Sequence, residues 1–375
     1  YRAANPPQIV QEFEVGTAEI TYALFLTLAA RPLGALLFGR LADRFGRRPI
    51  LMLDVVLFST FELATAFASS LTALLVLRFL FGIAMGGEWG IGASLAMESI
   101  PAKARGAVSG LLQSGYPCGF FLAALANWLL VDHIGWRGLF VVGAIPALLV
   151  LYIRRKVPES TVWKEGAQAA KRPGLFEAMR GHWKLAIYLM LLMMAFNMFS
   201  HGSQDMYPTF LKSQLHLGVG TVTVLTMLLN AGAIVGGLSF GAWSEKVGRR
   251  RGMIVAALLA LPCIPLWTHG GSLVLLGLGA FLIQVMVQGA WGIVPTYLNE
   301  LSPDEVRGTL PGFAYQLGNL LAASTATAQS WLADHSGGNY ALVMASWMAV
   351  VGVLLALLAW LGPEVRGTRF GKAGS

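Results

Sequence analysis

Long apolar runs separated by short polar segments recur along the whole chain of 375 residues. About 20 apolar residues are enough for a helix to cross the hydrocarbon core of a membrane, and the runs reach that length. The pattern therefore predicts eleven membrane-spanning helices, near residues 20–41, 50–68, 71–94, 104–131, 136–154, 183–207, 219–243, 252–268, 272–298, 308–332 and 339–361.

The composition also indicates a membrane protein. Hydrophobic residues make up 56% of the chain and charged residues 12%, so a soluble protein of this length would lack the polar surface to cover itself. Cys118 and Cys263 both lie within predicted spans, which argues against a disulfide framework. We expect the protein to lie in a plasma membrane, the cytoplasmic membrane of a bacterium, with lipid around its helices.

Positive charge is concentrated in alternate connecting segments. Of the 27 lysine and arginine residues, 22 lie in the segments 40–49, 99–105, 154–184, 244–251 and 299–307 and in the tail after Gly362. By the positive-inside rule, these segments face the cytoplasm. The net charge of +8 therefore reflects topology, and we expect no nucleic-acid partner.

The predicted helix near 183–207 leads into a cluster of polar side chains. Ionisable groups at membrane depth cost about 2.5–3.5 kcal/mol on insertion scales, so they indicate a functional site. Four of these residues are spaced four apart and would share one helical face: Asn197, His201, Asp205 and Thr209. We favour a water-filled pathway. The alternatives are a polar pair that joins two helices and a metal site, although the sequence offers no third ligand nearby and we expect no metal.

The sequence contains an internal repeat. The segment 39–48, GRLADRFGRR, recurs as 241–250, GAWSEKVGRR, at an offset of 202 residues. The same offset aligns Trp89 with Trp291, Glu98 with Glu300, Pro101 with Pro303, and Arg105 with Arg307. Such a repeat predicts two homologous helix bundles, an arrangement that encloses a midplane site in known transporters. We expect an N-terminal bundle over 1–153, a cytoplasmic linker over 154–184, and a C-terminal bundle with a short tail over 185–375.

The first copy of the repeat resembles the loop signature of the major facilitator superfamily. The matching residues are Gly39, Asp43, Arg44, Gly46, Arg47 and Arg48. Arg78 with Gly82 and Gly86 resembles the fourth-helix pattern of that family, and the segment 157–160 resembles the sequence that ends its first half. The resemblance implies an all-α membrane fold of two six-helix bundles. The first predicted helix matches the second helix of the family, so we expect the first to be missing from this chain.

A second motif resembles a branch of that family, the lactate/pyruvate:proton symporters of the sialate:proton symporter family. The matching residues are Asn197, Ser200, His201, Ser203, Gln204, Asp205 and Thr209. The branch also resembles this chain at Arg31, Gln316 and Asn319. Glu88 is a departure, because fungal lactate permeases carry an apolar residue there and sialate carriers are more similar to this chain.

The resemblance implies a function. It predicts a proton-coupled symporter of small monocarboxylates such as lactate and pyruvate that works by alternating access. The alternatives are a sialic acid:proton symporter and a membrane sensor that binds organic anions without transporting them. We expect no enzyme activity, because no nucleophile or metal set accompanies His201 and Asp205, and we expect a monomer without a cofactor.

Specific residues can be assigned to substrate and proton. Arginine matches a carboxylate with two parallel hydrogen bonds, and Arg31 lies in mid-span; its alternative role is an ion pair with a carboxylate of the missing helix. Asp205 is the expected proton carrier, His201 can share its proton, and Glu88 either takes part in coupling or bridges helices. The side chains expected to bind substrate are Arg31, Asn197, His201, Gln204, Gln316 and Asn319.

Charged residues at the cytoplasmic helix ends are expected to act as a gate. Contacts between the bundles would hold the outward-open state, although these residues could serve as topology determinants alone. The set is Gly39, Asp43, Arg44, Arg47, Arg48, Glu98, Arg105, Glu245, Arg249, Glu300 and Arg307. We expect Glu98 to pair with Arg105, and Glu300 with Arg307, inside each bundle. Arg78 is expected to be structural and to snorkel toward the outer surface.

Overall fold

The computed structural model describes residues 9, 12–13, 17–169, 181–368 and 370. Throughout these residues the regular elements are helices, which confirms the predicted all-α membrane fold. Nine helical segments within them are long and apolar enough to cross a membrane. The chain is therefore a multi-pass membrane protein.

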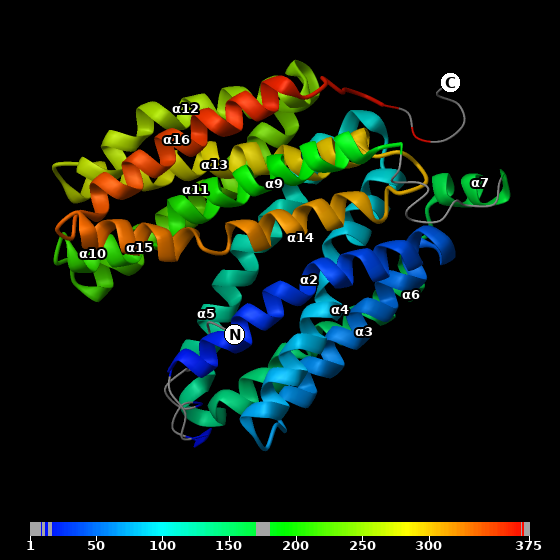
Figure 1. Cartoon of the computed structure of the whole chain (residues 1–375), viewed down its shortest axis with the longest axis horizontal. Coiled ribbons are helices and arrows are strands. Elements are labelled where there is room, and N and C mark those ends of the chain that lie inside the picture. Colours follow the sequence, from blue (N-terminus) through cyan, green and yellow to red (C-terminus); the bar gives the residue numbers. More distant parts are fainter. Residues whose placement is uncertain (1–8, 10–11, 14–16, 170–180, 369, 371–375) are drawn as a thin grey trace.

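The first half of the chain forms one group of helices, in the lower part of Figure 1. Its elements are α2 (Thr17–Phe45), α3 (Arg47–Thr65), α4 (Leu71–Ser99), α5 (Arg105–Gly143) and α6 (Leu149–Lys156). A short helix, α7 (Thr161–Ala169), follows at one end of this group, where Trp163 donates to the Asp43 carbonyl of α2 at 2.9 Å. We call α2 to α6 the N-terminal group.

The second half forms the C-terminal group, in the upper part of Figure 1. Its elements are α9 (Trp183–Gln204), α10 (Tyr207–Ser213), α11 (Val219–Val247), α12 (Arg249–His269), α13 (Leu273–Leu301), α14 (Leu310–Ala322), α15 (Thr325–His335) and α16 (Tyr340–Leu361).

The two groups meet mainly where α5 packs on α11 and where α2 packs on α14. Glycines allow the α5 and α11 backbones to touch: a Cβ on Gly110 would lie 2.2 Å from the Gly237 carbonyl oxygen, and one on Gly241 would lie 2.5 Å from that of Gly106. The groups approach each other at the end where α7 lies and spread apart toward the end where α10 lies (Figure 1). We call these the α7 end and the α10 end. The positive-inside rule assigns the α7 end to the cytoplasm.

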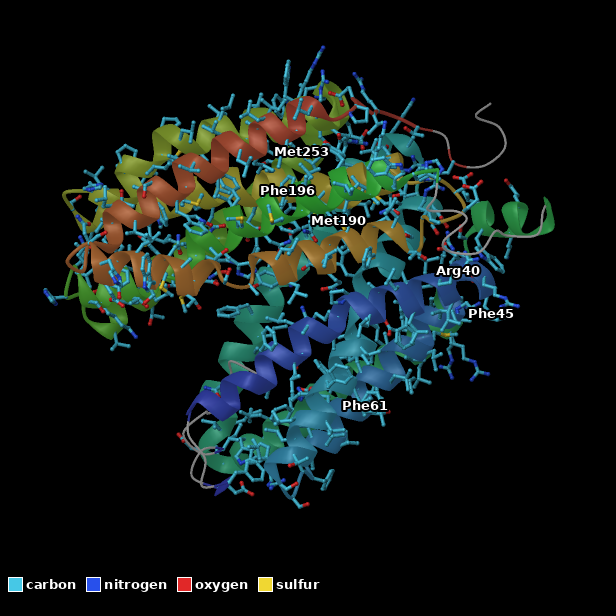
Figure 2. All side chains as sticks on the ribbon, in the orientation of Figure 1. Arg40, Phe45, Phe61, Met190, Phe196 and Met253 are labelled. Atoms are coloured by element: carbon cyan, nitrogen blue, oxygen red, sulfur yellow. The ribbon has the colours of Figure 1, made fainter. Side chains whose placement is uncertain are left out.

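The apolar core and the apolar surface are both extensive. Phe196, Met253 and Trp267 are completely buried in the C-terminal group, and Figure 2 labels the first two there. Large apolar side chains also cover the outside: on α16, Val350 is 68% exposed and Trp360 is 63% exposed. A surface of this kind suits contact with lipid and not with water.

Two of the eleven predicted spans are absent from the nine apolar segments. The helix α3 is less apolar than a typical span, because it carries four ionisable residues. They are Arg47, Arg48, Asp54 and Glu62. The span predicted over 308–332 is wrong as one continuous helix, because α14 ends at Ala322 and α15 begins at Thr325.

The helix predicted over 183–207 also ends early. Asp205 follows the last residue of α9, and α10 begins two residues later. Pro208 explains the break, because proline lacks a backbone N–H and its ring crowds the carbonyl four residues earlier. Asn197 and Thr209 therefore lie on two consecutive helices, α9 and α10.

The predicted boundary between the spans 104–131 and 136–154 appears as a kink. Gly135 interrupts α5 with φ 63° and ψ −177°. A positive φ of this size favours glycine, because other residues would place their Cβ too close to the backbone.

Candidate functional site

The packing of α2 on α14 sets the level at which Arg31 lies. A Cβ on Gly39 would lie 2.7 Å from the Thr309 Cα, and one on Gly312 would lie 4.0 Å from the Ala35 Cβ. The two helices therefore run antiparallel in a fixed register. One further turn of each helix brings Arg31 level with Gln316, between the two groups.

Arg31 has no ionic partner among the described residues. Its Nη2 contacts the sulfur of Met85 at 3.5 Å, which is a weak acceptor, and its Nε is buried without an acceptor. Glu88 and Tyr315 lie within electrostatic range of the guanidinium, but neither forms a hydrogen bond or an ion pair with it. A cation at this depth is costly without an anion. Arg31 is therefore free to bind one.

The α14 side of this level is aromatic and amidic. Gln316 donates from Nε2 to the Gly86 carbonyl at 3.4 Å, while its Oε1 is buried without a donor. The Tyr315 ring stacks on Trp89 with centroids 4.4 Å apart and meets Trp291 edge-on at 5.9 Å. The two tryptophans are related by the internal repeat, so each half of the chain supplies one of them to the same tyrosine.

A second polar group lies one turn further along α14. His201 Nδ1 lies 3.0 Å from Asp205 Oδ2, and His201 Nε2 lies 3.4 Å from Asn319 Oδ1. Both ring nitrogens thus face acceptor oxygens, and a protonated imidazole can donate to both. The structure brings together these three predicted residues, and the break after α9 places Asp205 at a helix end.

Two glutamines of α13, which the sequence analysis missed, bind the polar face of α9. Gln284 Nε2 donates to Ser203 Oγ at 2.9 Å, and Gln288 Nε2 donates to Ser200 Oγ at 3.0 Å. The signal in the sequence is that both interrupt the apolar run of the segment 273–301. Gln204, which was predicted, also donates to Ser200, at 3.4 Å.

Asn197 is placed differently from the other predicted ligands. It is buried, and its Nδ2 donates to the Met193 carbonyl of its own helix at 2.8 Å. In this conformation its amide nitrogen is therefore used within α9.

At the α7 end, an acidic side chain of each group accepts hydrogen bonds from residues at or just before the start of a helix in the other group. Asp43 accepts hydrogen bonds from the Gly308 N–H at 2.8 Å and from the Thr309 hydroxyl at 2.6 Å. The contact related by the repeat runs in the opposite direction, since Glu245 accepts from the Gly106 N–H. The repeat therefore supplies two equivalent hydrogen-bonded contacts between the groups at this end.

Two hydroxyl groups form a second pair of hydrogen bonds between the groups, again one in each direction. Ser94 Oγ of the N-terminal group donates to the Arg307 carbonyl at 2.7 Å. Thr296 Oγ1 of the C-terminal group donates to the Arg105 carbonyl at 3.0 Å.

Buried arginines tie the acids of each group together. Arg47 lies 2.8 Å from Asp43 and 3.1 Å from Glu98. The repeat-related bridge has distances of 3.0 and 3.1 Å and consists of Arg249 with Glu245 and Glu300. Each bridge stays within its own group and orients the acids that meet the other group.

The predicted pairing of the remaining arginines is wrong. Arg105 lies 3.7 Å from Glu300, and Arg307 lies 3.9 Å from Glu98, so both pairs run between the groups. The reason is geometric: Arg105 Nε is held by the Met97 carbonyl of its own group, which leaves its outer nitrogens facing the other group.

The remaining predicted gate residues are Gly39, Arg44 and Arg48. The close approach of α14 leaves no room for a Cβ at Gly39. Arg44 lies over the ring of Phe45, and the backbone N–H of Arg48 donates to Glu159 at 3.2 Å. Neither contact of these two arginines reaches the C-terminal group.

Arg78 does not snorkel as predicted. It is 2% exposed and lies 2.9 Å from the Glu62 carboxylate. It also bonds to the hydroxyl of Thr65 and lies over the rings of Phe81 and Phe140. Its ion pair makes it structural.

Comparisons with known proteins agree with this architecture. A family profile described as Major Facilitator Superfamily matches residues 1–323 and 206–374. A carboxylic acid transporter protein homolog of Saccharomyces cerevisiae is 31% identical over 95% of this chain, which spans 64% of the length of that relative. The sialic acid transporter NanX of Escherichia coli is 29% identical, over 94% of this chain and 87% of its own.

A solved structure shows the same fold. The proton:xylose symporter XylE, bound to 6-bromo-6-deoxy-D-glucose, superposes with a TM-score of 0.76 at 20% identity, over 96% of this chain and 90% of its own.

We expect Asp43→Asn to loosen the α7 end, because the amide lacks the charge that strengthens the bonds from Gly308 and Thr309. Hydrogen bonds to charged groups contribute about 1.5–3 kcal/mol, so the open population should rise about tenfold or more. The measurement is the maleimide labelling rate of a cysteine placed at Ser109, a fully buried position between the groups. The background carries Cys118→Ser and Cys263→Ser.

The matched control for this experiment is Asp132→Asn, which changes an exposed aspartate of the same helix group. Equal labelling rates in the parent, the control and Asp43→Asn would show that Asp43 does not hold this end closed.

Proposed function

Because this chain belongs to the Major Facilitator Superfamily, we propose that it is a proton-coupled secondary transporter of small organic acids. We further propose that its substrates are monocarboxylates such as lactate and pyruvate, as in the lactate/pyruvate branch of the sialate:proton symporters. The two relatives named above support the chemical class, since one is named for carboxylic acids and the other for sialic acid.

The observation that carries the proposal is the unpaired guanidinium of Arg31. Elsewhere in the described residues, buried arginines such as Arg47 and Arg249 are bonded to carboxylates. At Arg31 the carboxylate is missing, and the position lies between the helix groups. A substrate carboxylate supplies the missing anion through two parallel hydrogen bonds.

The surroundings of Arg31 favour a small anion. Tyr315 and Glu88 lie within electrostatic range of Arg31, and Gln316 lies level with it on α14 with a free acceptor. The rings of Trp89 and Trp291 pack around that tyrosine. Lactate has one carboxylate and one hydroxyl, so a few partners satisfy it. Sialic acid is the second candidate, and its glycerol and acetamido groups require further polar partners.

The proton is assigned to three groups. Asp205 is the proposed proton carrier. It shares the proton with His201, whose Nδ1 lies 3.0 Å from Asp205 Oδ2. Glu88, beside Arg31, responds to the arrival of a substrate carboxylate there. Glu88 belongs to the N-terminal group, and Asp205 and His201 belong to the C-terminal group, so one rearrangement of the two groups can move both proton and substrate.

Alternating access follows from the closed α7 end. The N-terminal bundle over 1–153 and the C-terminal bundle over 185–375 rotate against each other, and the linker 154–184 joins them. The conformation described here is assigned to the outward-open state. Opening to the cytoplasm breaks the reciprocal contacts of Asp43 and Glu245.

The test of this function is uptake into proteoliposomes under an inward proton gradient. Labelled lactate, pyruvate and sialic acid are compared with and without a protonophore. We expect lactate and pyruvate to accumulate and to compete for one site. Saturable sialic acid uptake that excess lactate fails to inhibit favours the second candidate, and binding without any accumulation favours a sensor.

We expect Arg31→Lys to weaken lactate binding, because lysine keeps the charge and loses the two parallel hydrogen bonds. A hydrogen bond to a charged group is worth about 1.5–3 kcal/mol, which corresponds to a loss of affinity of about tenfold to a hundredfold. The measurement is a binding titration in detergent. The control is Arg137→Lys, at an arginine that pairs with Glu12 away from the site. Parental affinity in Arg31→Lys would assign a structural role to the arginine.

We expect Asp205→Asn to abolish gradient-driven accumulation while counterflow exchange survives at least in part, because exchange does not require the proton to cycle. Both rates are measured in the same proteoliposomes. Asp334→Asn, at an exposed aspartate of α15, is the matched control. Accumulation by Asp205→Asn at the parental level removes the residue from the coupling mechanism.

A further inference from the structure

One carboxyl in the N-terminal group has no bonding partner. Asp54, on α3, is completely buried, and neither of its carboxyl oxygens receives a hydrogen bond from a described residue. An ionised carboxylate without donors is among the most costly groups to bury. A carboxyl that carries a proton avoids most of that cost.

The neighbours of Asp54 make the charged form less favourable still. A Cβ on Gly87 would lie 3.3 Å from Asp54 Oδ2 and 2.4 Å from the Phe38 Cβ, so the carboxyl lies against the α4 backbone beside α2. Glu88, the next residue on α4, is the charged group that acts on Asp54, and it has the same sign. From α2, Arg31 acts on Glu88 and not on Asp54. No charged group of α5 or α6 in the described part of the chain acts on it.

The internal repeat shows that the fold does not need an acid at either position. The offset of 202 residues relates Asp54 to Ala256 and Glu88 to Ala290, and both alanines are completely buried. A packing contact beside these positions recurs in both halves: a Cβ on Gly289 would lie 2.6 Å from the Phe240 ring, as one on Gly87 meets Phe38. An alanine therefore completes this packing, and the two acids add a chemical function to it.

The two carboxyls differ in depth. Asp54 is seven residues from the start of α3, about 10 Å from the α7 end, and Glu88 is eleven residues from the end of α4, about 16 Å from it. Glu88 is partly exposed, whereas Asp54 lies behind it on the side predicted to face the cytoplasm.

We propose that Asp54 and Glu88 form one buried proton-binding site, in which Glu88 receives the proton and Asp54 holds it. The proton leaves the Glu88 carboxyl and binds the Asp54 carboxylate, so Glu88 becomes an anion beside Arg31 and Asp54 becomes neutral. This inference rests on the proposed transport function.

The site couples proton and substrate through net charge. With the proton bound, the charges of Arg31, Glu88 and Asp54 sum to zero. Without it they sum to minus one, and that charge opposes the binding of an anion at Arg31. By linkage, the proton strengthens substrate binding and the substrate strengthens proton binding by the same factor.

The test uses two variants of the full chain. Asp54→Asn keeps the shape of the neutral acid, and Asp54→Ala copies the alanine that the second half carries at the related position. Both remove the proton and the charge. We therefore expect either variant to keep its lactate affinity across the alkaline pH range in which the parent loses affinity. Counterflow should continue, and accumulation under a proton gradient should fall to the level reached with a protonophore.

Infrared spectroscopy reads the proton directly. In the parent at neutral pH, we expect a C=O stretch from a protonated carboxyl shielded from water, reduced by one carboxyl in either Asp54 variant and unchanged in Asp132→Asn. The inference is overturned if that band is the same in the Asp54 variants, or if they retain the parental pH dependence and accumulation. If the parent does not accumulate lactate, the proposed function fails, and the infrared result still decides the protonation of Asp54.

Discussion

The cost of burying charge in an apolar medium governs this structure. At the α7 end the cost is met across the interface: Asp43 binds the Gly308 N–H, and Arg307 faces Glu98 of the other helix group. These bonds can form only when the two groups are in contact, so they favour the closed arrangement. Nearer the middle of the membrane, Arg31 Nε and both carboxyl oxygens of Asp54 have no hydrogen-bond partner among the described residues. This contrast distinguishes the contacts between the groups from the residues to which we assign the anion and the proton.

The internal repeat explains how one fold serves both purposes. Backbone contacts and gate residues are kept in the two halves, so that Asp43 and Glu245 make the same kind of bond in opposite directions. The chemistry between the bundles differs, because Ala256 stands where the first half has Asp54. The two halves share their helix packing, but they differ in the charged residues that they carry between the bundles. The proposed anion site and the pair Asp54 and Glu88 therefore belong to the first half, while the second half supplies Asp205 and His201 together with neutral donors and acceptors.

Sequence alone predicted what depends on composition and spacing: the all-α membrane fold, the repeat, and the contact between His201 and Asp205. It failed where tertiary contacts decide. The break between α14 and α15 falls in a run of alanine, serine and threonine without proline or glycine, so no local signal marks it. The partners of Arg105 depend on how two distant helices meet. Asp54 and Glu62 are the two acids of α3, and only the three-dimensional structure shows that Glu62 has an arginine partner and that Asp54 lacks donors.

The helix α14 links the proposed substrate and proton groups. It packs on α2 of one helix group and on α9 of its own, so its residues meet Arg31 at one level and His201 a turn further on. Separation of α14 from the N-terminal group would part Gln316 from the Gly86 carbonyl of α4 while Asn319 kept its contact with His201. A carboxylate bound between Arg31 and α14 would therefore resist that separation. In the proposed mechanism, opening at the α7 end gives Asp54 access to the cytoplasm, and loss of its proton restores the negative charge that opposes anion binding.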